Sequence, residues 1–326
     1  MPPGPPPGEP NSSETRKKDE SKLGKIPFCI KPMLATLVDA PFTRPEWIFE
    51  EKYDGVRMLT YKEGPHVSLL SRNAIDRTQR YPQVAEAVCK MKADTLLLGG
   101  EIVIFDAKGV SRFQLLQRGD GDAEYAVFDC LYCNGKDLRR EPLAARRRTL
   151  TSAVKPGRYL RVSAQLSSDG LEAFRVAGKR GLEGVIGKNL HSRYESQRSE
   201  EWLKVKTHQQ QEFVIGGFTE PKGSREDFGA LLLGVYVEGS LHFGGKVGTG
   251  FDDQTLRDLR RKFQPLIRSR SPFVEEVAKG RDVTYLKPRL VAQISFTEWT
   301  SDHKLRHPVY LGLRDDKSVK EVRREA

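Results

Sequence analysis

The chain has 326 residues, of which 37% are hydrophobic and 30% are charged, and its formal net charge is +11. These proportions are typical of a globular protein with room for two domains, and the absence of an apolar run of about 18 residues excludes a membrane-spanning helix. The first 25 residues hold five basic and four acidic side chains, so the positive excess belongs to the rest of the chain. The charge favours a polyanionic partner such as nucleic acid, the alternative being a merely basic soluble protein.

Residues 1–25 are rich in Pro, Gly, Ser, Lys and Glu and nearly lack apolar side chains. We expect this segment to be disordered, and its lack of an apolar stretch predicts no secretory signal. The chain has four cysteines, of which Cys130 and Cys133 form a CxxC pair. No second CxxC or nearby histidine pair completes a zinc site, so we interpret all four as reduced thiols of a cytosolic protein.

Residues 26–207 are predicted to form one domain of mixed α+β structure, because short β-rich runs alternate with turn signals and helical periodicity. The predicted strands are Trp47–Lys52, Val56–Tyr61, Val67–Ser71, Thr95–Phe105 and Ala126–Leu131. The predicted helices are Tyr81–Lys92 and Leu171–Arg180. No regular strand–helix–strand repeat is visible, so we expect mixed antiparallel sheets with helices packed against them.

The polar residues 208–211 have no apolar anchor and predict a hinge, after which residues 212–326 form a second domain. Its predicted strands, separated by glycine-rich turns, are Phe213–Phe218, Ala230–Val237, Ser240–Lys246 and Leu290–Thr297. A basic amphipathic helix is predicted at Asp253–Phe263. About five short strands in a segment of this length indicate a small, partly open β-barrel of the OB type.

Lys52 begins the motif Lys-Tyr-Asp-Gly-Val-Arg between two predicted strands. It is a candidate nucleophile once its surroundings remove the proton, although an Asp-Gly turn beside a solvated lysine would give the same letters. Farther on, the strand period of two places Trp202, Lys204 and Lys206 on one face. Two adjacent ammonium groups favour a phosphate chain between them, while an exposed basic edge strand is the alternative.

Two glutamates stand beside otherwise apolar strand sequences. Glu101 interrupts Leu96–Asp106, and Glu183 precedes a short strand that ends in Lys188. A buried carboxylate needs a partner, which could be a ribose hydroxyl, a Mg²⁺ ion or a lysine. Taken alone, each glutamate is better explained as a member of a structural salt bridge.

In their order along the chain, these motifs resemble those of the covalent nucleotidyltransferases, which include ATP-dependent DNA ligases, RNA ligases and mRNA capping enzymes. The resemblance rests on Lys52-x-Asp54-Gly55-x-Arg57, Ser71-Arg72-Asn73, Glu101, Phe128-Asp129, Glu183-Gly184-Val185 and Trp202-Leu203-Lys204-Val205-Lys206. Later segments, among them Leu305-Arg306-His307-Pro308 and Gly312–Lys317, are similar to the ligase module of bacterial end-joining ligases of the ligase D type. The resemblance covers residues 31–325 and implies an adenylation domain followed by an OB-fold β-barrel domain. One departure is Gln197, where relatives usually have glycine.

The resemblance also implies a role for each matching residue. Lys52 would be the nucleophile that becomes lysine–AMP, with Arg314, Asp316 and Lys317 as further catalytic residues of the second domain. The remaining implied contacts are Glu50 and Phe128 to adenine, Arg57 and Glu101 to ribose, Lys204 and Lys206 to the α-phosphate, Glu183 and Glu101 to a metal, and Arg72 and Arg306 to nucleic acid.

The implied function is ATP-dependent sealing of nicked or broken double-stranded DNA, with Mg²⁺ or Mn²⁺ as the metal. The expected setting is double-strand break repair in the bacterial cytoplasm, near the nucleoid, by a monomer that works with a Ku-like end-binding protein and no membrane. The open alternatives are an RNA ligase, a GTP-using capping enzyme or a non-catalytic OB nucleic-acid-binding protein. An NAD⁺-dependent ligase is disfavoured because it would need a further nicotinamide-binding domain and a four-cysteine zinc module.

Overall fold

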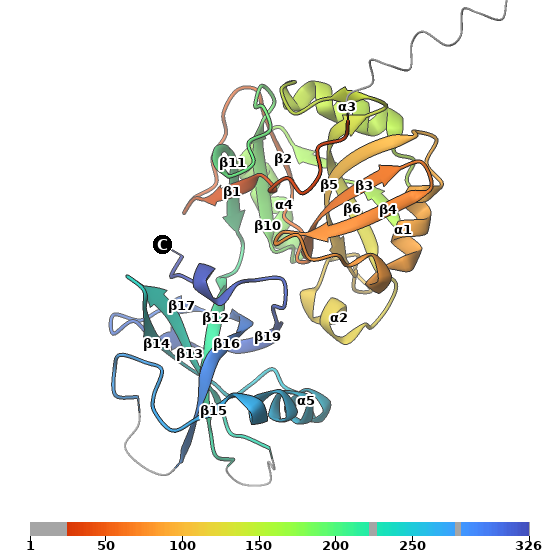
Figure 1. Ribbon diagram of the computed structural model, residues 1–326. Helices are drawn as coiled ribbons and strands as arrows, with labels where there is room; N and C mark the ends of the chain where they lie inside the picture. Colours follow the sequence, from red (N-terminus) through yellow and green to blue (C-terminus); the bar gives the residue numbers. More distant parts are fainter. Residues whose placement is uncertain (1–24, 222–226, 278–281, 326) are drawn as a thin grey trace, which may run out of the picture.

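The computed structural model describes residues 25–221, 227–277 and 282–325, and its chain forms two domains (Figure 1). The predicted disordered segment therefore lies outside the described residues, except for Lys25. Within the described ranges, no helix is both long and apolar enough to cross a membrane.

The first domain is built on two mixed sheets. One has the strand order β1-β11-β10-β2-β9 and the other β4-β3-β5-β6-β7, with β8 added beside β6. The first sheet contains β1 (Leu34–Leu37), β2 (Trp47–Glu51), β9 (Gln165–Ser167), β10 (Gly184–Asn189) and β11 (Arg198–Lys206). The second contains β3 (Val56–Glu63), β4 (His66–Ser71), β5 (Thr95–Val103), β6 (Glu124–Cys133), β7 (Lys136–Asp137) and β8 (Leu160–Val162). Among the described strand pairs of this domain, only β1–β11 and β6–β8 are parallel, which confirms the predicted mixed and largely antiparallel domain.

The helices of this domain are α1 (Pro82–Cys89), α2 (Phe113–Arg118), α3 (Leu143–Ala153) and α4 (Gly170–Arg180), with a short 3₁₀ turn, η2 (Thr78–Arg80). Helix α4 follows the sequence prediction because Asp169 caps its first turn and Gly181 ends it in the left-handed region. Helices α2 and α3 were not predicted. The first is only six residues long, and in the second a buried arginine, Arg146, breaks the apolar face.

The second domain is an antiparallel sheet with the order β14-β13-β12-β16-β15, and β19 pairs with β16. The elements are β12 (Gln210–Thr219), β13 (Leu231–Val237), β14 (Ser240–Val247), α5 (Asp253–Phe263), η3 (Gln264–Leu266), β15 (Ile267–Arg268), β16 (Val283–Ser295), β17 (Glu298–Trp299), β18 (Leu305–Arg306), β19 (Val309–Leu313) and η4 (Val319–Glu321). Helix α5 has the predicted bounds and buries Leu256, Leu259 and Phe263. The β-rich second domain is thus confirmed, although strand pairing among its described residues leaves the sheet open.

The predicted hinge at residues 208–211 differs from the structure, because β12 already begins at Gln210. The backbones of Gln210 and Gln211 pair with Ser295 and Ile294 of β16. The sequence did not predict this start of β12 because the side chains of Gln210 and Gln211 are polar, whereas backbone pairing does not require an apolar side chain.

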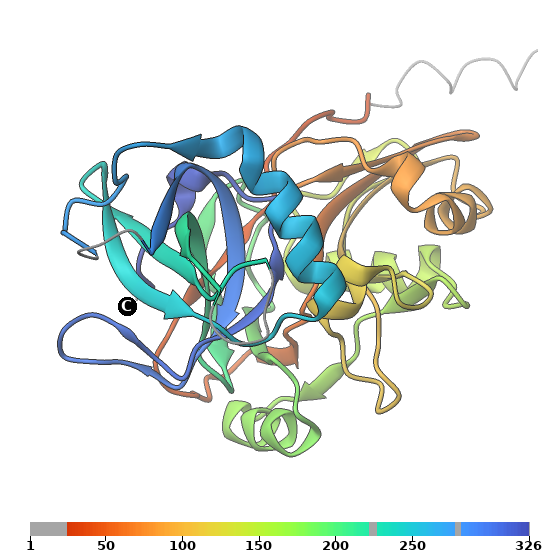
Figure 2. The same cartoon turned by 90° about the horizontal axis from the view of Figure 1, so that it is seen from below.

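The two domains touch on the side of α2 and β19 (Figures 1 and 2). Arg118 forms an ion pair with Asp252 at 2.9 Å, and the N–H of Leu313 donates to the side chain of Gln117 at 3.1 Å. These contacts join residues that precede the linker to residues that follow it, and they hold the two domains together.

Candidate active site

A cavity of about 530 Å³ lies where the first-domain sheets face the second domain. All but one of the residues that the sequence predicted for the site line this cavity. They are Glu50, Lys52, Arg57, Arg72, Glu101, Phe128, Glu183, Lys204, Lys206, Arg314, Asp316 and Lys317. The exception is Arg306, which lies on β18 and pairs with Glu298 at the surface.

Lys52 follows the last residue of β2, and its backbone N–H donates to the carbonyl of Gly184 at 3.0 Å. This pairing brings the carboxylate of Glu183 onto the Lys52 ammonium group. Gly184 permits the close approach of β10 and β11, because a Cβ at this position would lie 2.1 Å from the carbonyl oxygen of Val205. The two candidate residues are therefore joined by strand pairing across more than a hundred residues.

Lys52 is surrounded by acids. Burial disfavours its charged form, but the carboxylates of Glu183 and Glu101 outweigh burial and hold the pKa of Lys52 above its ordinary value. Burial, and next the charge of Glu183, raises the pKa of Asp54 to about 7. In this state Lys52 is an ammonium ion, so it must lose a proton before it can act as a nucleophile.

Glu50 belongs to the cavity wall. Its carboxylate accepts hydrogen bonds from Lys188 at 2.7 Å and from Ser163 at 3.2 Å, and it also pairs with Arg147 of α3. Glu50 and Lys188 are almost completely buried. Since a buried polar group needs partners, these contacts compensate for the burial of the Glu50 carboxylate and fix its orientation.

Phe128 lies beside Glu50 and is 7% exposed. The Arg57 guanidinium carbon and the Lys188 Nζ atom lie 4.3 and 4.2 Å from the Phe128 ring centroid. Arg57 faces Glu101 directly across β3 and β5. Its Nε and Nη2 atoms are buried without a hydrogen-bond partner among the described residues. Unpaired buried donors are costly, so this guanidinium is suited to receive a ligand from the cavity.

Lys204 and Lys206 lie on the same face of β11, as their alternation predicted. An anion does lie between them, and it is the carboxylate of Glu325 from the second domain, 2.9 Å from Lys204 and also paired with Lys206. Burial lowers the pKa of Lys204 to about 8, against the opposing effect of Glu325. The site therefore binds an anion through two closely spaced ammonium groups.

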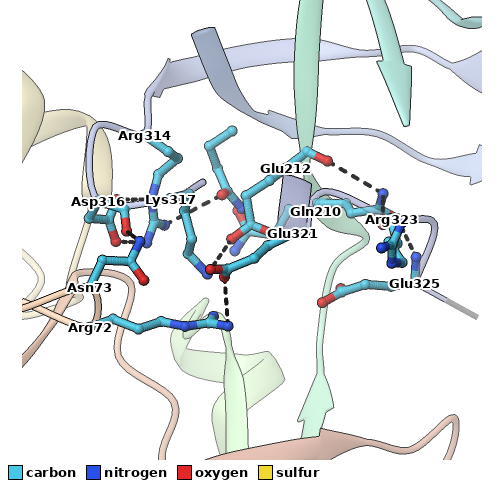
Figure 3. A network of polar contacts seen from close by, with 12 residues as sticks. Arg72, Asn73, Gln210, Glu212, Arg314, Asp316, Lys317, Glu321, Arg323 and Glu325 are labelled. Carbon is cyan, nitrogen blue, oxygen red and sulfur yellow. Dashed lines mark hydrogen bonds and ion pairs between the residues drawn. The ribbon is translucent and has the colours of Figure 1, made fainter. Parts of the chain in front are cut away.

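Arg314, Asp316 and Lys317 reach the cavity from the second domain (Figure 3). Arg314 donates two hydrogen bonds of 2.8 Å to Asp316, and its guanidinium carbon lies 4.4 Å from the Phe113 ring centroid. Lys317 pairs with Glu212 at 3.0 Å. Below them, Arg72 of the first domain pairs with Glu321 at 2.8 Å.

Sequence reasoning missed several residues around this site. Arg146 is fully buried and forms two hydrogen bonds with Asp129, at 2.8 and 3.1 Å. Leu143, Arg146 and Leu150 share one helical face, and that spacing could have identified Arg146 as buried. Lys188, close to the end of a mostly apolar strand, carried a similar signal, whereas nothing local indicated Glu325.

Comparison with known protein families identifies the family of the chain that forms this cavity. Residues 32–206, more than half of the chain, match the family described as "ATP dependent DNA ligase domain". Residues 224–317 match the "ATP dependent DNA ligase C terminal region". The matches fall on either side of the linker between β11 and β12.

Two curated relatives are similar over nearly the whole chain. "Multifunctional non-homologous end joining protein LigD" of Pseudomonas aeruginosa is 40% identical over 331 residues, which cover 97% of this chain and 39% of that protein. "Multifunctional non-homologous end joining DNA repair protein LigD" of Mycobacterium tuberculosis is 38% identical over 305 residues, covering 91% and 40%. The chain thus spans about two fifths of the length of these relatives.

A solved structure described as "mycobacterial DNA ligase D complexed with ATP and MES" superposes with a TM-score of 0.69 at 36% identity. The match covers 91% of this chain and 98% of that one. Family, sequence and fold agree, and the chain belongs to the ATP-dependent DNA ligases.

Proposed function

We propose that this chain joins DNA strands through a lysine–AMP intermediate on Lys52. The observation that carries the proposal is the position of Lys52 in a cavity that also holds Arg57, whose Nε and Nη2 atoms have no hydrogen-bond partner in the described part of the chain, and the anion-binding pair Lys204 and Lys206. A nucleophile, donors free for a ligand and cations spaced for phosphate are what nucleotidyl transfer requires.

The reaction would proceed in three substitutions at phosphorus. The Lys52 Nζ atom attacks the α-phosphorus of ATP and the bond to pyrophosphate breaks. A 5′-phosphate oxygen of DNA then displaces Lys52 from AMP, and finally the 3′-hydroxyl displaces AMP to form the phosphodiester. Because each step needs in-line geometry, catalysis consists mainly of positioning and of stabilising charge.

The base and ribose of ATP would lie against the first-domain sheets. Glu50, fixed by Lys188, would accept a hydrogen bond from the adenine amino group. Arg57 would turn from the Phe128 ring toward the ribose, assisted by Glu101 on the neighbouring strand, and leave a ring face for adenine. This exchange satisfies the guanidinium donors that lack a partner.

The phosphates would lie between the two domains. Lys204 and Lys206 would bind the α-phosphate. Arg314, oriented by Asp316, and Lys317 would stabilise the charge that builds on departing pyrophosphate. For DNA, the candidates for phosphate contacts are Arg72, which lines the cavity, and Arg306, which lies on the surface of the second domain.

A divalent metal fits the carboxylates near Lys52. No group of three or more potential metal ligands is preformed among the described residues. Mg²⁺, however, commonly uses only one or two carboxylates together with substrate phosphates, so Glu183 and Glu101 would suffice. Burial raises the pKa of Glu101 above its ordinary value despite the opposing charges of Lys52 and Arg57, so this carboxylate would gain from a cation. The bound Mg²⁺ or Mn²⁺ would supply charge neutralisation at the phosphate oxygens.

The biological setting that we propose is double-strand break repair. Both curated relatives above are named for non-homologous end joining. The net charge of +11 suits double-stranded DNA with nicks or ends as the substrate, held by a monomer that a Ku-like end-binding protein recruits.

The test is transfer of label from nucleotide to protein. The chain is incubated with α-labelled ATP or GTP and Mg²⁺ and run on a denaturing gel. We expect acid-labile label from ATP only, lost in Lys52→Ala and kept in Lys90→Ala, a control at an exposed lysine paired with Glu86. Label from GTP would favour a capping enzyme, and label retained by Lys52→Ala would refute the assignment of the nucleophile.

A further inference from the structure

Residues 319–325 bring Glu321 and Glu325 into the cavity from the second domain (Figure 3). We call them the acidic segment after these two glutamates, although Lys320, Arg323 and Arg324 make its formal net charge +1. Its two glutamates meet cations of the first domain that our proposed function assigns to phosphates. Glu325 contacts Lys204 and Lys206, and Glu321 contacts Arg72. We propose that the acidic segment is a built-in phosphate mimic that closes the nucleotide site until ATP displaces it. This inference rests on the proposed function.

The backbone of the acidic segment is held firmly. The Gln211 side chain donates to the Arg323 carbonyl and accepts from the Glu325 N–H, both at 2.9 Å. The Tyr236 N–H donates to the Val322 carbonyl at 2.9 Å, and the Val322 side chain is buried in the second-domain core. These contacts hold the Glu325 carboxylate at a fixed point.

The Glu325 carboxylate and a phosphate cannot use the same donors together. Lys204 and Lys206 each have one short contact to it, and both lysine side chains are mostly buried. Two buried ammonium groups without an anion would repel each other and lose their solvation. The carboxylate therefore stabilises the two lysines where they lie, and an incoming phosphate would take over the same role.

The position of the acidic segment links this exchange to domain movement. Residues 319–325 are anchored on the second domain, whereas their cationic partners lie on the first domain. Opening the domains would remove both glutamates from their partners at once and expose Lys204, Lys206 and Arg72 together. The closed arrangement is thus a latched state, and ATP must compete with the latch to bind.

The test replaces Glu325 by a side chain of the same shape that carries no charge. In Glu325→Gln we expect calorimetric affinity for inorganic tripolyphosphate to rise about fivefold, as expected when a partly buried ion pair no longer competes. The KM for ATP in lysine–AMP formation should fall by the same factor, with kcat unchanged. The matched control is Glu172→Gln, which removes an exposed glutamate paired with Arg175 on α4 and should change neither quantity.

The outcomes separate this inference from the proposed function. Unchanged or weaker tripolyphosphate binding in Glu325→Gln would overturn the latch, even if lysine–AMP forms normally. Tighter binding in a protein that never forms lysine–AMP would support the latch and refute the ligase chemistry. As a second variant, Glu325→Ala should bind tripolyphosphate more tightly as well, because the competing charge is again absent.

Discussion

The most buried ion pair in the first domain offers a sharp test of what holds the cavity wall in place. Arg146 of α3 and Asp129 of β6 are both fully buried, and Arg146 also donates to the carbonyls of Glu141 and Ser192 at 2.8 and 2.9 Å. Asp129 follows Phe128 on the same strand. We therefore predict that Arg146→Met destabilises the domain and disturbs the ring expected to contact adenine.

The expected loss of stability in Arg146→Met follows from the Asp129 charge that stays buried without its partner. Removing one partner of a buried ion pair costs about 3–5 kcal/mol, because the remaining charge keeps its desolvation penalty without compensation. This is a large part of the roughly 5–15 kcal/mol that stabilises a typical protein. Replacing both partners by apolar side chains of similar volume, as in Asp129→Leu with Arg146→Met, should recover most of the loss, since no charge then stays buried.

The assay is urea unfolding monitored by circular dichroism, with Arg148→Met as the matched control. Arg148 is exposed on the same helix, so its loss should change the free energy of unfolding by less than about 0.5 kcal/mol. A loss below about 1 kcal/mol in Arg146→Met would contradict the reasoning from buried charge. A double variant as unstable as the single one would show that the hydrogen bonds to Glu141 and Ser192 dominate instead.

Two further predictions concern the second domain and the pH dependence. Lys317→Ala should reduce the rate of lysine–AMP formation at least tenfold, yet it should spare the sealing of a pre-adenylated nick. Equal losses in the two assays would contradict a role of Lys317 in the departure of pyrophosphate. Burial raises the pKa of Glu51 to about 7. Between pH 4.5 and 7 the folded state therefore binds more protons than the unfolded state. For this reason the free energy of unfolding falls as the pH rises through that window. Glu51→Gln should therefore be more stable than the parent by up to about 3 kcal/mol at pH 8 and show no gain at pH 4, as thermal unfolding at both pH values would reveal.

The sequence by itself determined the local elements and the grouping of residues within them. Strand alternation put Lys204 and Lys206 on one face of β11, and amphipathic helical spacing defined α5, because these patterns are complete within a few residues. The ordered motifs also identified the nucleotidyltransferase resemblance, and all but one of the predicted site residues line one cavity.

Only the tertiary structure decided which charges meet. Glu50 and Lys188 are 138 residues apart, and Lys204 and Glu325 are 121 apart, so their pairing depends on strand order and on how the second domain closes. Helix α3 escaped prediction for the same reason: its buried face carries Arg146, whose partner Asp129 lies on another element. A single charged residue in a sequence is predicted to be solvent-exposed. It can be buried in a core only where the fold places an opposite charge beside it.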